Sequence, residues 1–158
     1  MCGITGIYNR DGGDGIDRGL LECMAQTLAH RGPDDSGYYV KDNLGFGFKR
    51  LSIIDLSTGS QPMYNEDKTL VSVCNGEIYN YQELRQTLLE KGHRFYTKCD
   101  VEVLVHLYEE YGRDFMQKLN GQFAFALYDG NRRELLLARD QAGIAPLFYT
   151  TADKTFLF

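Results

Sequence analysis

Two predicted β-hairpins constrain the fold of this chain more than any other feature. Residues 123–128 and 134–139 are rich in apolar residues and flank a connection that begins with Asp-Gly, a pair typical of tight hairpin turns. Residues 38–40 and 44–49 form a second pair of strand candidates around an Asp-Asn turn. Each pair is interpreted as two strands joined by a short turn.

The remaining elements mix short strands with helices. Further strand candidates are residues 4–8, 70–74, 147–150 and 156–158. Helices are predicted from residue 17 to about 29, from 80 to 92 and from 100 to 112, each beginning at an Asn or Asp that can cap a helix. Asn80 and Glu83 also have the spacing of a capping box. This order of elements predicts sheets that are covered by helices.

The composition is that of an ordinary globular domain with an acidic balance. The 158 residues fit one domain, and 17 basic against 22 acidic side chains give a formal net charge of −5. This charge argues against nucleic acid or an anionic membrane as a partner. No apolar run approaches the ~18 residues of a membrane span, and the N-terminus lacks the pattern of a secretory signal. We therefore expect a cytoplasmic protein.

The cysteines and histidines predict neither a disulfide framework nor a metal site. The four cysteines, which have no Cys-x-x-Cys spacing and no His-rich neighbour, are Cys2, Cys23, Cys74 and Cys99. No metal is therefore expected in this domain. His93 and His106 are interpreted as residues on helix or loop surfaces that take no part in the chemistry.

Cys2 is a candidate nucleophile because it becomes the N-terminal residue once Met1 is removed. It then carries a thiol with a reference pKa of about 8.5 beside a free amine with a reference pKa of about 7.7–8.0. A nucleophile with a base on the same residue is the arrangement of N-terminal-nucleophile hydrolases. The alternative is a small residue at a frayed terminus, and Cys2 alone does not decide between the two.

Motifs further along the chain favour the catalytic interpretation. In order they are Met1-Cys2-Gly3-Ile4, His30-Arg31-Gly32-Pro33-Asp34, Arg50-Leu51-Ser52-Ile53-Ile54-Asp55, Gln61-Pro62-Met63, Asn75-Gly76-Glu77-Ile78-Tyr79-Asn80, Gly121-Gln122-Phe123-Ala124-Phe125-Ala126, Arg139-Asp140 and Gly143-Ile144-Ala145-Pro146-Leu147. This ordered set resembles the N-terminal glutaminase domain, a class II glutamine amidotransferase, of glutamine-hydrolysing asparagine synthetases. The resemblance covers essentially residues 1–158 and implies an α+β fold, a four-layer αββα sandwich of antiparallel sheets.

The resemblance implies catalytic roles for three residues. Cys2 is the expected nucleophile, while Asn75 and Gly76 are expected to form the oxyanion hole from a side-chain amide and a backbone N–H. Asn-Gly is also the strongest two-residue turn signal, so a plain hairpin turn is the alternative. However, residues 80–91 are predicted to be helical, which leaves no paired strand directly after that turn.

The resemblance also implies a binding site for the glutamine backbone. The expected substrate-binding residues are Arg50, Leu51, Ser52, Ile53, Ile54, Asn75, Gly76, Glu77 and Asp100. Arg50 would pair with the α-carboxylate, which suits a planar guanidinium. The alternative is that Arg50 is only a solvated charge at a strand end. Asp100 and Glu77 would receive the α-ammonium, and Asp100 could cap a helix as well. The segment from His30 to Asp34 is expected to be architectural.

The whole-protein function implied by the resemblance extends beyond these residues. Glutamine is expected to yield glutamate and ammonia here, and the ammonia would amidate aspartate in an ATP-dependent synthetase domain of the same polypeptide. That domain, with its ATP and Mg²⁺, is not recognisable in residues 1–158, and the apolar run at 156–158 is interpreted as a truncated end. No cofactor is expected in the glutaminase domain, and a homodimer is expected for the longer protein. Open alternatives are a related amidotransferase with another acceptor and a non-catalytic interaction module.

Overall fold

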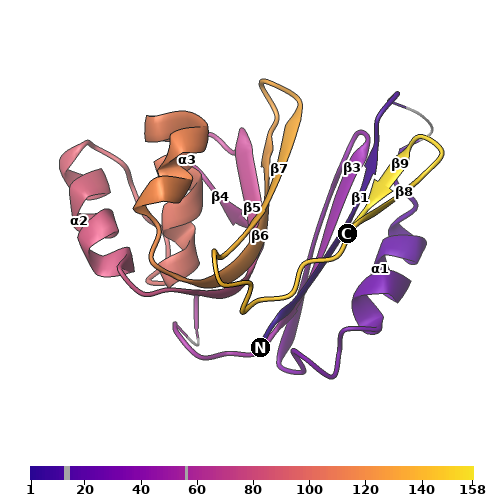
Figure 1. Cartoon of the computed structure of the whole chain (residues 1–158), viewed down its shortest axis with the longest axis horizontal. Helices are drawn as coiled ribbons and strands as arrows, with labels where there is room; N and C mark the ends of the chain where they lie inside the picture. The colour runs from indigo at the N-terminus through magenta and orange to yellow at the C-terminus, as the bar shows by residue number, and fades with distance from the viewer. Residues whose placement is uncertain (13–14, 56) are drawn as a thin grey trace.

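Two antiparallel sheets face each other, and helices cover their outer sides (Figure 1). This computed structural model describes residues 1–12, 15–55 and 57–158. The first sheet has the order β2-β3-β1-β9-β8, with bounds β1 Gly3–Asn9, β2 Asp35–Lys41, β3 Leu44–Arg50, β8 Thr150–Ala152 and β9 Thr155–Leu157. The second has the order β4-β5-β6-β7, with bounds β4 Met63–Tyr64, β5 Leu70–Ile78, β6 Gly121–Asp129 and β7 Glu134–Arg139.

The helices complete four layers, which confirms the predicted αββα sandwich. Helix α1 (Arg18–Gln26) lies outside the first sheet, and α2 (Tyr81–Glu90) and α3 (Val103–Tyr111) lie outside the second (Figure 1). Two 3₁₀ helices flank α3, η1 (Asp100–Glu102) and η2 (Gly112–Lys118). Both predicted hairpins are present, as β2–β3 and β6–β7. Among the described residues no helix is long and apolar enough to cross a membrane.

Strand β3 shows how the sequence separates two of these layers. Its Phe46 and Phe48 point into the core between the sheets, where they are buried against β5 and β6. Its Gly45 and Gly47 alternate with them and lie under α1. A Cβ on Gly47 would lie 3.0 Å from the Cβ of Ala25, so the missing side chains let α1 approach the sheet closely.

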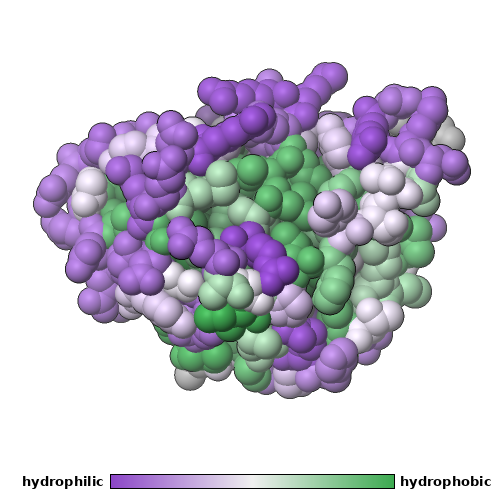
Figure 2. Space-filling model, in the orientation of Figure 1, coloured by the Kyte–Doolittle hydropathy of each residue, from purple (hydrophilic) through white to green (hydrophobic). Residues whose placement is uncertain are grey.

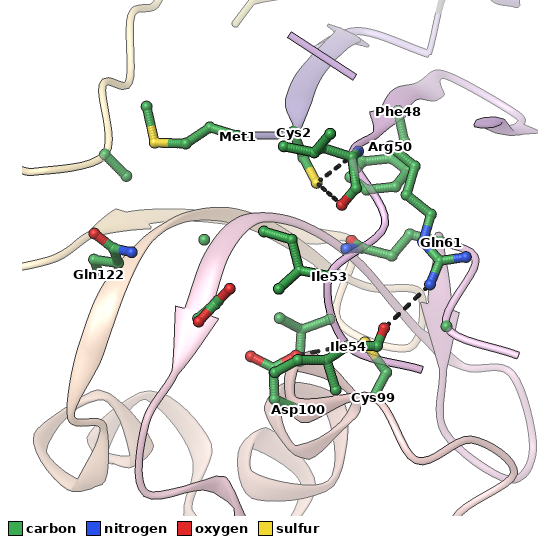
Figure 3. Close-up of a pocket in the computed structure, with 16 residues that line it drawn as sticks. Met1, Cys2, Phe48, Arg50, Ile53, Ile54, Gln61, Cys99, Asp100 and Gln122 are labelled. Carbon is green, nitrogen blue, oxygen red and sulfur yellow. Dashed lines mark hydrogen bonds between the residues drawn. The ribbon is translucent and has the colours of Figure 1, made fainter. Parts of the chain in front are cut away.

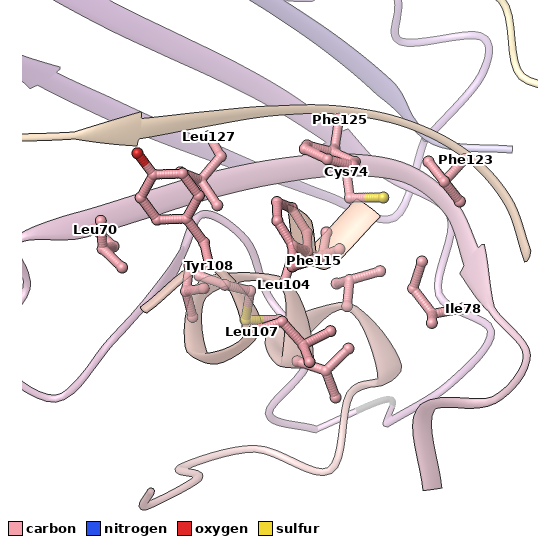
Figure 4. Close-up of a cluster of buried hydrophobic side chains, with 14 of the residues drawn as sticks. Leu70, Cys74, Ile78, Leu104, Leu107, Tyr108, Phe115, Phe123, Phe125 and Leu127 are labelled. Carbon is pink, nitrogen blue, oxygen red and sulfur yellow. The ribbon is translucent and has the colours of Figure 1, made fainter. Parts of the chain in front are cut away.

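A second core fills the space between the β4–β7 sheet and its helices (Figure 4). Cys74 of β5 and Phe125 of β6 pack there against Leu104 and Leu107 of α3 and Phe115 of η2. Apolar surface also reaches the exterior across the middle of the molecule, between the two sheets (Figure 2). The strands that carry the candidate site are therefore held between two packed cores.

The predicted side-chain caps are correct in one case and wrong in two, although α2 does begin directly after Asn80. Asp17 caps α1 by accepting hydrogen bonds from Gly19 N (2.8 Å) and Leu20 N (3.2 Å), although α1 ends at Gln26 rather than near residue 29. The capping box at Asn80 is wrong, because its side chain bonds the backbone of residues 118 and 120 instead. Asp100 does not cap a helix either, since it accepts a hydrogen bond from the distant strand β5.

The predicted strand at residues 147–150 is also wrong for most of its length. Only Thr150 belongs to a strand, β8, and residues 146–149 have no regular structure. Phe148 is 82% exposed and Tyr149 is 71% exposed, so neither side chain is buried in a core formed by the described residues. The strand predicted at 156–158 is confirmed as β9, which pairs with β1 and β8.

Candidate active site

Backbone contacts fix Cys2 at the entrance of strand β1. The register pairs Gly3 with Lys49, which places Cys2 beside the end of β3. Arg31 donates a hydrogen bond from Nε to the carbonyl of Cys2 at 3.0 Å. The Cys2 sulfur accepts a hydrogen bond from Leu51 N at 3.4 Å and lies 3.6 Å from Leu51 O (Figure 3). The predicted architectural role of the His30–Asp34 segment is consistent with the Arg31 contact.

Burial determines the protonation of this thiol. It raises the pKa of Cys2 above the ordinary cysteine value, and the negative charge of Asp100 adds a little to the rise. The Leu51 N–H and the positive charges of the N-terminus and Arg50 oppose it without cancelling it. The Cys2 thiol is therefore protonated near neutral pH, and it needs a base before it can attack a carbon atom.

Arg50 organises the loop that follows β3. It is 5% exposed, and its Nη2 donates to the carbonyl oxygens of Ile54 (3.2 Å) and Asp55 (2.5 Å). From the other side, the carboxylate of Asp34 accepts a hydrogen bond from Ser52 N at 2.7 Å. These bonds hold the loop over the Cys2 sulfur.

Gly76 must be a glycine in this structure. Strand β5 runs straight through Asn75 and Gly76 to Ile78, so the alternative of a hairpin turn is wrong. Gly76 has φ +141°, and a Cβ built there would overlap the carbonyl oxygen of Gln122 on β6. Its neighbour Asn75 is 3% exposed, and the Asn75 Oδ1 is buried without a hydrogen-bond partner among the described residues.

Asp100 and Gln61 tie the same strand to its surroundings. Asp100 accepts a hydrogen bond from Ile78 N at 2.8 Å, and burial raises the pKa of its carboxyl group although several backbone N–H groups oppose the rise. The Gln61 side chain accepts from Cys74 N at 2.6 Å and donates to Cys74 O at 3.0 Å. This paired contact fixes β5 just before Asn75.

One pocket collects most of the predicted site residues (Figure 3). Those that line it are Cys2, Arg50, Leu51, Ile53, Ile54, Gly76, Glu77 and Asp100. Ser52 is not among its lining residues, and Asn75 lines a neighbouring hollow together with Gly3 and Arg31. The pocket therefore has a thiol, a guanidinium and two carboxylates around one small volume.

Sequence reasoning missed other residues that line this pocket. They are Phe48, Gly59, Gln61, Val101, Gln122 and Ala145, and the lining also includes Met1 and Cys99. Gln61, Gln122 and Ala145 stand in motifs noted above, so the sequence marked these positions without indicating that they line the pocket. Gln122 reaches the pocket because β6 pairs with β5 and places it opposite Glu77, a pairing between segments more than 40 residues apart.

The arrangement can hold a zwitterion beside a nucleophile. Arg50 offers a positive charge, while Asp100 and Glu77 offer negative charges, and all three border the pocket with Cys2. An α-amino acid carries a carboxylate and an ammonium that match this pattern. Its side chain would then extend toward the thiol.

Comparison with known proteins shows the family of the chain. A family model described as a glutamine amidotransferase domain matches residues 1–158. The chain belongs to this glutamine amidotransferase family. It is 44% identical over 160 residues to asparagine synthetase [glutamine-hydrolyzing] 2 of Bacillus subtilis (strain 168), covering 100% of this chain and 21% of that protein.

Another relative of this glutamine amidotransferase domain is asparagine synthetase [glutamine-hydrolyzing] 2 of Oryza sativa subsp. japonica. The two are 43% identical over 148 residues, covering 94% of this chain and 25% of the rice protein. The resemblance to the glutaminase domain of asparagine synthetases is thus confirmed, and the chain spans about a quarter of the length of the curated relatives it matches.

A solved structure confirms the fold of the domain. The glutamine phosphoribosylpyrophosphate amidotransferase of B. subtilis matches with a TM-score of 0.77 at 21% sequence identity. The match covers 99% of this chain and 41% of that chain. At this identity the likeness shows a shared architecture, the sandwich of two antiparallel sheets.

Proposed function

We propose that this glutamine amidotransferase domain hydrolyses L-glutamine to glutamate and ammonia through the Cys2 thiol. The observation that carries the proposal is the position of Cys2 in a pocket bordered by Arg50 on β3, Glu77 on β5 and Asp100 in η1. This pattern matches the two backbone charges of glutamine and leaves the side-chain amide for the thiol. The family membership of the chain supports the same chemistry.

The chemistry begins once Met1 is removed and the nitrogen of Cys2 is a free amine. That amine takes the thiol proton, and the thiolate sulfur forms a bond to the amide carbon of glutamine. The tetrahedral intermediate collapses, the carbon–nitrogen bond breaks, and the amine returns its proton to the leaving ammonia. Water then attacks the thioester, which releases glutamate and restores the thiol.

The negative oxygen of the tetrahedral intermediate needs hydrogen-bond donors. The backbone N–H of Gly76 lies on a strand segment that lines the pocket, and the Asn75 amide is the second expected donor. A donor of this kind typically supplies about 3–4 kcal/mol of transition-state stabilisation. Pairing of β5 with β6 and the Gln61 contact to Cys74 hold these donors rigid, so that they need no rearrangement during the reaction.

We assign the binding of unreacted glutamine to the charged residues of the pocket and to the loop after β3. We assign the glutamine α-carboxylate to Arg50 and the α-ammonium to Asp100 with Glu77. The raised pKa of buried Asp100 is consistent with this assignment, because a carboxylate in that position gains from a bound cation. Backbone groups of residues 51–54 would complete the contacts, since Leu51, Ile53 and Ile54 line the pocket.

For the whole protein we propose delivery of the ammonia to an ATP-dependent synthetase domain of the same polypeptide that amidates aspartate. The relatives' greater length supports a fused domain of this kind. ATP and Mg²⁺ would bind there, the glutaminase chemistry itself would use no cofactor, and the full-length protein would be a homodimer. The exposed Phe148 and Tyr149 are apolar surface that the second domain could cover. We place the protein in the cytoplasm, where its four free cysteines would stay reduced.

Replacing the nucleophile tests this proposal. Cys2→Ala in a chain without Met1 should abolish release of glutamate and ammonia from glutamine while far-ultraviolet circular dichroism stays unchanged. The matched control is Cys23→Ala, which removes an exposed thiol on α1 outside the pocket and should leave the rate unchanged. A folded Cys2→Ala chain with the parent rate would contradict the proposal, and an inactive parent chain would favour the non-catalytic interaction module.

A further inference from the structure

Four side chains that the proposed chemistry does not use gather beside α2 and α3. Glu66 follows β4, His93 follows α2, and His106 and Glu109 lie about one turn apart on α3. One ligand atom from each lies within 4.8 Å of the others. Three segments that are separated in the sequence therefore bring two imidazoles and two carboxylates together.

The expectation that both histidines are surface residues is wrong. The side chain of His106 is 0% exposed and that of His93 is 8% exposed. The ring of Phe95 covers His106, with centroids 4.4 Å apart. Neither ring nitrogen of His106 has a hydrogen-bond partner among the described residues. A buried polar ring left in this state costs free energy unless another ligand satisfies it.

The spacing of the cluster fits a shared ion better than hydrogen bonds. Glu66 oxygens lie 3.6 Å from His93 Nδ1 and 3.4 Å from His106 Nδ1, and Glu109 Oε2 lies 3.8 Å from His93 Nδ1. Hydrogen bonds between nitrogen and oxygen are shorter, at about 2.7–3.2 Å. Zinc bonds of about 2.0–2.2 Å put the ligand atoms of a tetrahedral site roughly 3.3–3.6 Å apart.

The other nitrogen of each ring faces a second carboxylate. His93 Nε2 lies 3.1 Å from Glu110 Oε1, and His106 Nε2 lies 3.7 Å from Glu102 Oε1. Histidines that bind a metal through one nitrogen commonly direct the other toward a carboxylate, which fixes the tautomer and the ring orientation. Both imidazoles are therefore oriented to present Nδ1 toward the Glu66 carboxylate.

Charge and access also favour a cation. Lys91 pairs with Glu110 at 2.7 Å and balances that carboxylate, whereas Glu66 and Glu109 bring two further negative charges to the cluster. A divalent ion would balance these two charges. A surface hollow bordered by Glu66, His93 and Glu109 gives such an ion a route from solvent.

We propose that Glu66, His93, His106 and Glu109 bind one divalent transition-metal ion, and that Zn²⁺ matches this set of two imidazoles and two carboxylates best. The ion ties α3 to the segments that follow β4 and α2, so its role is structural and separate from glutamine hydrolysis. The expectation of a metal-free domain rested on the absence of Cys-x-x-Cys spacing and of a His-rich neighbour in the sequence, whereas these histidines and glutamates meet only in the folded chain.

Calorimetric titration of the purified, chelator-treated chain with Zn²⁺ tests this site. One ion should bind per chain, and Zn²⁺ at about 100 times its Kd should raise the melting temperature by roughly 5–10 °C. Glu109→Gln and His93→Ala should each weaken Zn²⁺ binding at least about 100-fold. Even the loss of a residue that only hydrogen-bonds a metal ligand typically lowers metal affinity by about 10–100-fold. His30→Ala removes the remaining imidazole, which is exposed and outside the cluster, and should leave the affinity unchanged.

Two results would overturn the site. One is the absence of stoichiometric Zn²⁺ binding by the parent chain, which would show that the cluster is only a network of His–Glu ion pairs. Binding that survives both substitutions would place the ion on other groups, such as the thiols. Circular dichroism of each variant checks the fold, and Glu109 with its 43% exposed side chain gives a variant that removes little packing.

Discussion

Substitution of Gly76 by alanine gives a strong test of the geometry of β5. Gly76 has φ +141°, a conformation that is essentially restricted to glycine. The added methyl group would also overlap the carbonyl oxygen of Gln122 and lie 2.6 Å from the Cα of Phe123. Both obstacles are backbone atoms of β6, so no side-chain rotation can relieve them.

The expected magnitude follows from a matched control. Gly92 after α2 also has a positive φ, +101°, but a Cβ there would meet nothing within 4 Å. Gly92→Ala should cost only the backbone strain, about 1–3 kcal/mol. Gly76→Ala should add an overpacking cost near the upper end of about 1–3 kcal/mol. At roughly 2–4 °C per kcal/mol, Gly76→Ala should melt about 6–12 °C below Gly92→Ala.

Urea unfolding measures this difference directly. The chain has 11 tyrosines and no tryptophan, so tyrosine fluorescence and circular dichroism can report the transition. Glutamine hydrolysis by the Met1-free variants gives a second readout, because a displaced β5 moves the Gly76 N–H while Gly92→Ala leaves the pocket intact. Equal free energies of unfolding and equal rates for the two variants would refute the close approach of β5 and β6 at Gly76.

Three further predictions concern the proposed site. Asn75→Ala should lower kcat for glutamine hydrolysis by about 100–1000-fold with little change in KM, because the variant lacks one hydrogen-bond donor to the oxyanion. An unchanged kcat would exclude that role. Asp100→Asn keeps an oxygen acceptor for the Ile78 N–H but removes the charge, so steady-state kinetics should show KM raised about 10–100-fold. An unchanged KM would remove Asp100 from ammonium binding. Because burial raises the pKa of Cys2, its alkylation by iodoacetamide, followed by peptide mass spectrometry, should accelerate about tenfold per unit between about pH 7 and 9. A rate independent of pH in this range would contradict the raised pKa.

Local patterns predicted the elements of this fold but not the partners of their polar side chains. The strand pairs β2–β3 and β6–β7 depend on neighbours in sequence, and both were recognised. The Asn80 and Asp100 side chains bond backbone groups 22–40 residues away rather than the helix starts beside them. Helix-capping propensity cannot anticipate such a contact, because it arises only after the sheet and the helices have packed.

The same limit applies to the candidate site and to the histidine cluster. The ordered motifs carry Cys2 and Arg50, and the resemblance that these motifs support placed both residues with Asp100 in one pocket. Gln122 enters that pocket through strand pairing, which composition and periodicity do not specify. His106 lies off the apolar stripe of α3, so helical periodicity leaves it facing solvent, whereas the segment that contains Phe95 covers it in the structure.

The central claim is that Cys2 works as an N-terminal residue, and removal of Met1 tests it most directly. With Met1 attached, the nitrogen of Cys2 is an amide without basicity near neutral pH, and Met1 itself lines the pocket. Ammonia release from glutamine is measured on one sample before and after treatment with a methionine aminopeptidase, with mass spectrometry confirming the loss of one methionine. We predict very slow hydrolysis before cleavage and a large increase after it. Equal rates in the two states would contradict the role of the Cys2 amine as the base.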